Sequence, residues 1–137
     1  MRLLRTLVLL LVSSVASAQE FKPFPRANIT EDQWNTYFNE VRMKLTSNVQ
    51  DIEDQKLLVF TDAAGKTIYA FAKPGHPAHP AWIARKLEQR GDELWIGQIG
   101  YFSGAEPPFA QLFRAYIELN DKMRQDFKNR PQQVESK

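Results

Sequence analysis

The chain has 137 residues and no cysteine, and its 18 Lys and Arg residues exceed its 16 Asp and Glu residues by two. The absence of cysteine excludes disulfides, thiolate metal sites and cysteine nucleophiles, so the fold must be held together by packing. A chain of this length suits one domain, and 43% hydrophobic residues supply enough material for one core.

The first 18 residues have the order of a secretory signal. Arg2 and Arg5 precede the apolar run 7–12 (LVLLLV), and the small residues of the segment 16–18 (ASA) precede the polar Gln19. The apolar run is too short to span a bilayer, which takes about 20 residues. We therefore predict a signal peptide over 1–18 and an exported chain without a stable membrane anchor after cleavage. The expected location is the periplasm, with the extracellular space as the alternative.

Removal of this segment changes the charge of the protein. The segment holds two arginines and no acid, so the remaining 119 residues have a formal net charge of zero. Binding to a phosphate backbone needs a clustered positive surface. We therefore expect no nucleic-acid partner.

The first predicted helix begins after an extended lead-in over 19–28. Thr30 suits the N-cap position, Gln33 completes a capping box, and Ile29 can staple against Trp34. Apolar residues then recur at helical spacing as far as Leu45.

A β-hairpin is predicted next, after an acidic connection over 51–54. The runs 57–60 and 67–71 are rich in strand formers, and the segment 62–66 between them has the composition of a turn. Gly65 in this turn is able to adopt a positive φ.

Three further elements complete the predicted order. Trp82, Ile83 and Leu87 indicate a short helix, with Gly91 just past its end. The run 94–102 predicts a third strand. A last helix carries a long apolar stripe made of Phe109, Leu112, Phe113, Tyr116, Ile117, Asn120, Met123 and Phe127.

The predicted fold class is α+β, with the order α-β-β-α-β-α. A small three-stranded sheet packs against two long helices, both on one face. The single domain covers 29–130, and the residues 131–137 form a flexible tail.

The segment 75–80 (GHPAHP) contains both histidines of the chain, each followed by proline. Imidazole is a common ligand of Zn and Cu, which makes His76 and His79 candidate metal ligands. In an extended run the two histidines would share a face about 9 Å apart, so a metal would need a turn and a third ligand. The other interpretations are a rigid structural loop and a contact with a partner or ligand.

Six aromatic residues are more than one face of a three-stranded sheet can bury; they are Tyr69, Phe71, Trp82, Trp95, Tyr101 and Phe102. They form either a two-sided core or an exposed patch, which on a protein surface marks a binding site.

Catalytic patterns are weak. No serine lies in a nucleophile-elbow pattern, and Ser103 has no histidine that the sequence places beside it. The acidic residues lie in loops or at the ends of elements, where carboxylates are usually solvated. No glycine-rich phosphate loop is present.

The run Tyr69–Pro80 (YAFAKPGHPAHP), followed by the predicted helix and a glycine-containing strand, resembles a segment of small exported bacterial proteins of uncharacterised function. The resemblance implies a location in the bacterial envelope. It implies no activity, cofactor or catalytic residue.

The sequence therefore predicts a non-enzymatic module that binds another envelope protein or a small ligand. The predicted binding residues are His76, His79, Trp82, Tyr101 and Phe102. One alternative is a periplasmic protein that binds Zn or Cu through His76 and His79, and another is a small hydrolase of unknown type.

The signal peptide leads to a direct prediction. Cleavage after Ala18 should leave a chain that begins at Gln19, because the small residues at 16 and 18 fit a signal peptidase. Mass spectrometry of the protein from its native host checks this. A full-length chain as the main species would contradict the prediction.

Overall fold

The structure is a computed structural model that describes residue 24 and residues 26–130. The predicted signal peptide, most of the lead-in and the tail 131–137 lie outside the described residues. Within the described part of the chain, no helix is both long enough and apolar enough to cross a membrane.

The fold is a five-stranded antiparallel sheet, in which neighbouring strands follow one another along the chain, with one helix on each face. In chain order the elements are α1 (Glu31–Lys44), β1 (Val49–Ile52), the 3-10 turn η1 (Glu53–Gln55), β2 (Leu57–Asp62), β3 (Thr67–Ala72), β4 (Ala81–Arg90), β5 (Glu93–Phe102) and α2 (Glu106–Asn129). The predicted α+β class is correct. The predicted three strands, the order α-β-β-α-β-α and the placement of both helices on one face are wrong.

The start of α1 is the one predicted. The Gln33 N–H donates to Thr30 Oγ1 at 3.1 Å, and the Thr30 N–H donates to Gln33 Oε1 at 2.9 Å, which completes the capping box. From this start α1 lays Trp34, Tyr37 and Val41 on the sheet, where all three are buried.

The predicted hairpin is present as β2 and β3, with Asp62 opposite Thr67. Asp62 Oδ1 accepts a hydrogen bond from the Gly65 N–H at 3.0 Å and so shapes the turn. The residue with positive φ in this turn is Lys66, at 53°, and not the adjacent Gly65.

The short helix predicted from Trp82, Ile83 and Leu87 is instead part of the ten-residue strand β4. It pairs with β5 from Ala81 opposite Phe102 to Arg90 opposite Glu93. Gly91, at a φ of 65°, is the first residue of a two-residue hairpin turn and not the end of a helix. Both faces of the first half of β4 are buried, so its apolar residues show no alternation that would identify a strand.

The predicted acidic connection over 51–54 begins inside an edge strand, β1, which pairs with β2. Lys73 Nζ lies 2.6 Å from Asp51 Oδ1 and 3.2 Å from Glu53 Oε2. These ion pairs attach the acidic segment to the end of β3. Because β1 is mostly exposed, it lacks the apolar pattern by which strands are recognised.

A hydrophobic core lies on each face of the sheet, one under α1 and one under α2. The core under α1 contains Ile29, Trp34, Tyr37, Val41, Leu45, Phe60, Tyr69, Phe71, Trp82, Ala84 and Tyr101. The core under α2 contains Ala72, Ala78, Ala81, Ile83, Phe102 and Phe109, with Leu112, Phe113 and Tyr116 against it. Successive residues of β4 and β5 contribute to opposite cores, as the two-residue repeat of a strand requires.

Loss of Phe109 should weaken the second core. Its buried ring stacks on Phe102 with the ring centres 4.7 Å apart. Phe109→Ala should lower the free energy of unfolding by about 3–5 kcal/mol, measured as a fall in the denaturant midpoint. Lys122→Ala, at an exposed position of the same helix, should change the midpoint little. Equal midpoints for the two variants would contradict the packing of α2.

Candidate functional site

The loop between β3 and β4 folds into two consecutive turns. The His76 N–H donates to Lys73 O at 2.9 Å, and the His79 N–H donates to His76 O at 3.0 Å. The Ala78 N–H donates to His76 Nδ1 at 2.9 Å. The segment is therefore turned, unlike the extended run in which the two histidines would share a face about 9 Å apart.

The second histidine is attached to the α1 core. The ring of His79 meets that of Trp34 edge to face, with the ring centres 5.2 Å apart, and the His79–Pro80 peptide bond is cis. The Ser103 N–H donates to Pro80 O at 2.7 Å, which ties the loop to the end of β5. These contacts are those of a rigid structural loop.

The metal interpretation has no third ligand in the described part of the chain, where no group of three or more His, Cys, Asp or Glu side chains could hold a metal ion. His76 Nδ1 already accepts a backbone hydrogen bond. Burial lowers the pKa of both histidines, and for His79 the nearby Glu31 acts in the opposite direction.

The predicted aromatic binding residues lie in the cores. Trp82 is 1% exposed, Tyr101 6% and Phe102 5%. The ring centre of Trp82 lies 4.8 Å from that of Tyr37 and 5.1 Å from that of Tyr101. Their side chains form a two-sided core and not an exposed patch beside the histidine loop.

No serine–histidine pair that could support the hydrolase alternative is present among the described residues. No hydrogen bond joins Ser103 to either histidine, and Asp62 holds the turn after β2. Burial raises the pKa of Tyr37 to about 12, so its phenol stays protonated at neutral pH.

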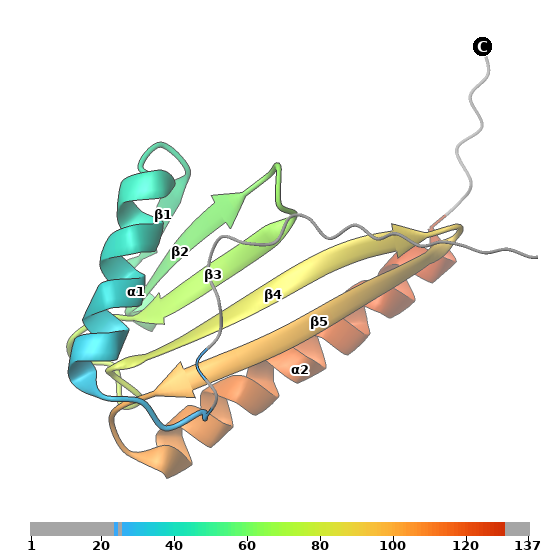
Figure 1. Cartoon of the computed structure of the whole chain (residues 1–137). Helices are drawn as coiled ribbons and strands as arrows, with labels where there is room; N and C mark the ends of the chain where they lie inside the picture. The colour runs from blue at the N-terminus through green and yellow to red at the C-terminus, as the bar shows by residue number, and fades with distance from the viewer. Residues whose placement is uncertain (1–23, 25, 131–137) are drawn as a thin grey trace, which may run out of the picture.

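The surface that does stand out is the outer side of β5, which sequence reasoning did not find. β5 is ten residues long and forms one edge of the sheet (Figure 1). On its outer side, residues 26–29 pair only with its last residue: the Phe102 N–H donates to Ala27 O, and Phe102 O accepts from the Ile29 N–H, both at 2.9 Å. The rest of this edge has no backbone partner in the described part of the chain.

A groove runs along this edge, between β5 and α2. A cavity of about 630 Å³ lies toward the Phe102 end and one of about 540 Å³ toward the Glu93 end. The first is lined by Phe24, Ala27, Ile99, Gly100, Tyr101, Glu106, Phe109, Ala110, Phe113, Arg114 and Ile117. The second is lined by Glu93, Leu94, Trp95, Ile96, Arg124 and Lys128. We call the edge and both cavities the β5 groove.

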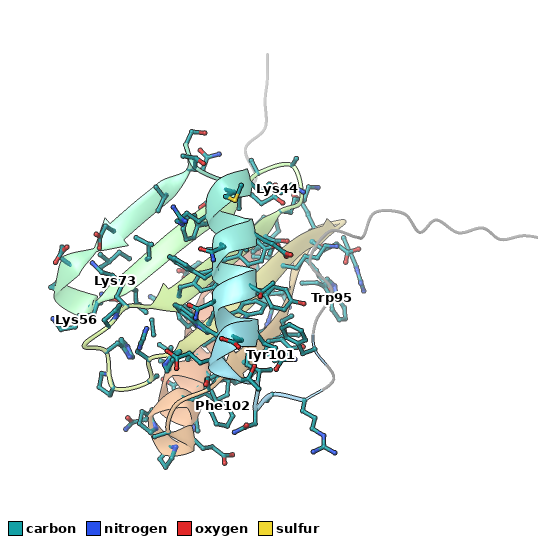
Figure 2. The ribbon with its side chains drawn as sticks, turned by 60° about the vertical axis from the view of Figure 1, so that its left-hand side comes forward. Lys44, Lys56, Lys73, Trp95, Tyr101 and Phe102 are labelled. Carbon is teal, nitrogen blue, oxygen red and sulfur yellow. The ribbon has the colours of Figure 1, made fainter. Side chains whose placement is uncertain are left out.

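Three large apolar side chains along the β5 groove are exposed. Trp95 is 48% exposed, Ile99 40% and Ile117 39%. Figure 2 shows Trp95 clear of α1, whereas Tyr101 lies close to that helix. The Arg90 guanidinium carbon sits 4.2 Å from the centre of the Trp95 ring, and the Trp95 side chain is exposed despite this contact.

The position of α2 beside this edge is set by the buried Arg85 and Asn120 and the partly buried Gln98. Arg85 Nε donates to Asn120 Oδ1 at 2.8 Å, and Asn120 Nδ2 donates to Gln98 Oε1 at 2.7 Å. Gln98 Nε2 donates to Phe113 O at 3.0 Å. The chain of hydrogen bonds thus runs from β4 through α2 to β5 and back to α2.

Comparison with known proteins gives no match: no family model, curated protein or solved structure is significantly similar to this chain.

The histidine loop should make stability depend on pH. The folded pKa of His76 is below its ordinary value of 6.5, so the unfolded chain binds more protons between the two values. Stability should therefore be complete above about pH 7.5 and fall as the pH drops through about 6.5 toward the folded pKa. His76→Asn retains an acceptor for the Ala78 N–H but does not titrate, so it should reduce this slope. Urea unfolding at several pH values measures it, and an unchanged slope would contradict the role of His76.

Proposed function

We propose that this chain is an exported, non-enzymatic module that binds an extended segment of another polypeptide at the β5 groove. The bound segment adds to the sheet as a further strand beside β5. Its side chains on one face lie against α2, and those on the other face meet Trp95 and Ile99. Export rests on the predicted signal peptide.

The observation that carries the proposal is the combination of an open strand edge with a groove along it. Strand addition uses backbone hydrogen bonds for affinity and pockets for alternate side chains for specificity. The β5 edge offers the first, and the cavities of about 630 and 540 Å³ offer the second. An exposed strand that is neither covered nor paired is also the arrangement that monomeric proteins avoid.

A small apolar ligand is the second candidate, since the larger cavity falls within the range of small-molecule sites, about 300–1,000 Å³. Phe109, Phe113 and Ile117 would supply its apolar walls, with Arg114 and Glu106 as polar groups at the rim. The polypeptide is preferred because it also satisfies the backbone groups of β5, which a small apolar molecule leaves open.

Site-specific photo-crosslinking in cells tests the proposal. A benzophenone side chain at position 99 should give protein adducts, because Ile99 lines the groove. The same side chain at position 43 should give none, although Met43 on α1 is 75% exposed.

A strand-blocking variant makes the test specific for pairing at the edge. Ile96→Pro, combined with the crosslinker at position 99, should remove the adducts, because proline has no N–H to donate. Ile96→Ala loses a similar side chain but keeps that N–H, so it should retain them. Adducts that persist with Ile96→Pro, or that form equally at position 43, would contradict strand addition.

A further inference from the structure

The outward backbone groups of β5 lie on alternate residues. The N–H and C=O of Phe102 point away from β4, because they pair with Ala27 and Ile29. The register of β4 and β5 continues without a bulge, so every second residue of β5 points the same way. The residues with outward groups are therefore Leu94, Ile96, Gln98 and Gly100, and none has a backbone partner on that side in the described chain.

We propose that the polypeptide bound in the β5 groove is a second copy of this chain, paired antiparallel through β5. The two copies form a continuous ten-stranded sheet, five strands from each. The inference rests on the proposed function and names its partner. A two-fold axis passes between the Gly97 residues of the two copies.

This register satisfies every open group of the edge. Leu94 pairs with Gly100 of the second copy, and Ile96 pairs with Gln98 of the second copy. By symmetry, Gly100 and Gln98 of the first copy pair with Leu94 and Ile96 of the second. If the register shifted by two residues in one direction, Leu94 would lie opposite Phe102 of the second copy. The outward N–H and C=O of Phe102 are already bonded to Ala27 and Ile29. A shift in the other direction sets Gly100 opposite Asp92, in the turn. Gly97 is thus the only centre that pairs all four outward residues of each strand with one another.

The same register covers the exposed apolar side chains. Trp95 and Ile99 are an even number of residues from Tyr101, so they share its face of β5, the one that carries α1. Both are exposed, because they lie beyond the part that α1 covers. With Gly97 on the axis, Trp95 lies directly opposite Ile99 of the second copy. Aromatic and β-branched side chains form favourable cross-strand pairs. The symmetry repeats this pair, so four large apolar side chains leave water together.

The charges on α2 are complementary under the same symmetry. Arg114, Ile117 and Asp121 are three or four residues apart and share one side of the helix, and the first two line the groove. Gln98 contacts α2 at Phe113 and Asn120, which puts the axis near the middle of the helix. An antiparallel second α2 brings Arg114 to face Asp121 of the second copy, with Ile117 close to the axis. Asp121 already pairs with Arg124 of its own helix, so Arg114 joins an existing ion pair.

A single cysteine tests the register. The chain has no cysteine, so any disulfide in a one-cysteine variant joins two copies. A Cβ added at Gly97 meets no atom within 4 Å, so Gly97→Cys fits without strain. Residues opposite each other in a non-hydrogen-bonded pair have Cα atoms about 4.5 Å apart, within disulfide reach.

Under mild oxidation, Gly97→Cys should run as a covalent dimer on a non-reducing gel. Trp95→Cys is the matched control, two residues along on the same face. Its two cysteines would lie four residues apart along the strands, beyond disulfide reach, so it should stay monomeric on the gel. A failure of Gly97→Cys to cross-link, or equal cross-linking of both variants, would overturn the register.

Sedimentation of the purified protein tests the dimer itself. The unmodified protein and Ile96→Ala should have twice the mass of one chain, and Ile96→Pro should have the mass of one chain. A monomeric unmodified protein, or a dimeric Ile96→Pro, would overturn the inference. If position 99 then cross-links to a different protein in an Ile96→Pro-sensitive way, self-pairing is wrong while the proposed function stands. Absence of any adduct at position 99 counts against the proposed function.

Discussion

The position of α2 depends on a guanidinium buried without a carboxylate. Arg85 is 4% exposed, and in the described chain its partners are Asn120, the Met123 sulfur at 3.0 Å and the face of the Tyr116 ring at 5.0 Å. Burial lowers the pKa of Arg85, but the side chain stays charged at any physiological pH. A buried charge that loses a partner is strongly destabilising, so α2 has few alternative positions. Because Asn120 also binds Gln98, the same contact fixes α2 relative to the edge strand.

Each helix covers only part of its face of the sheet. α1 packs on β2, β3 and the near ends of β4 and β5, through a cluster of aromatic rings around Trp82. α2 lies along β5 on the opposite face, as Figure 1 shows. The far half of β5 is therefore covered on one face only, and its outer edge is open. Trp95 and Ile99 are exposed for this reason, whereas Trp82 and Tyr101, which lie under α1, are buried. The candidate site is thus the part of the β5 edge that residues 26–29 do not pair with and that α1 does not cover.

The errors of the sequence-based fold have specific physical causes. The first half of β4 alternates Trp82 and Ala84 into one core with Ala81 and Ile83 into the other, so its apolar run has neither a strand nor a helix period. The glycine after it is a valid helix end as well as a hairpin residue, and the Gly91-Asp92 pair was the one local signal for the hairpin. β1 was missed because an exposed edge strand carries polar residues on both faces.

Local interactions are what the sequence by itself determined: the Thr30 capping box, the β2–β3 hairpin, the strand over 94–102 and the amphipathic last helix. These depend on residues that are neighbours in the chain, so spacing reveals them. The sequence also identified the surplus of aromatic residues, but not which of them are buried. Only the tertiary structure placed Trp82, Tyr101 and Phe102 inside and left Trp95 outside, because burial depends on which strand a helix from elsewhere in the chain covers. The open side of β5 was equally beyond the sequence, since an edge is defined by the absence of a neighbouring strand, and strand order is a property of the assembled sheet.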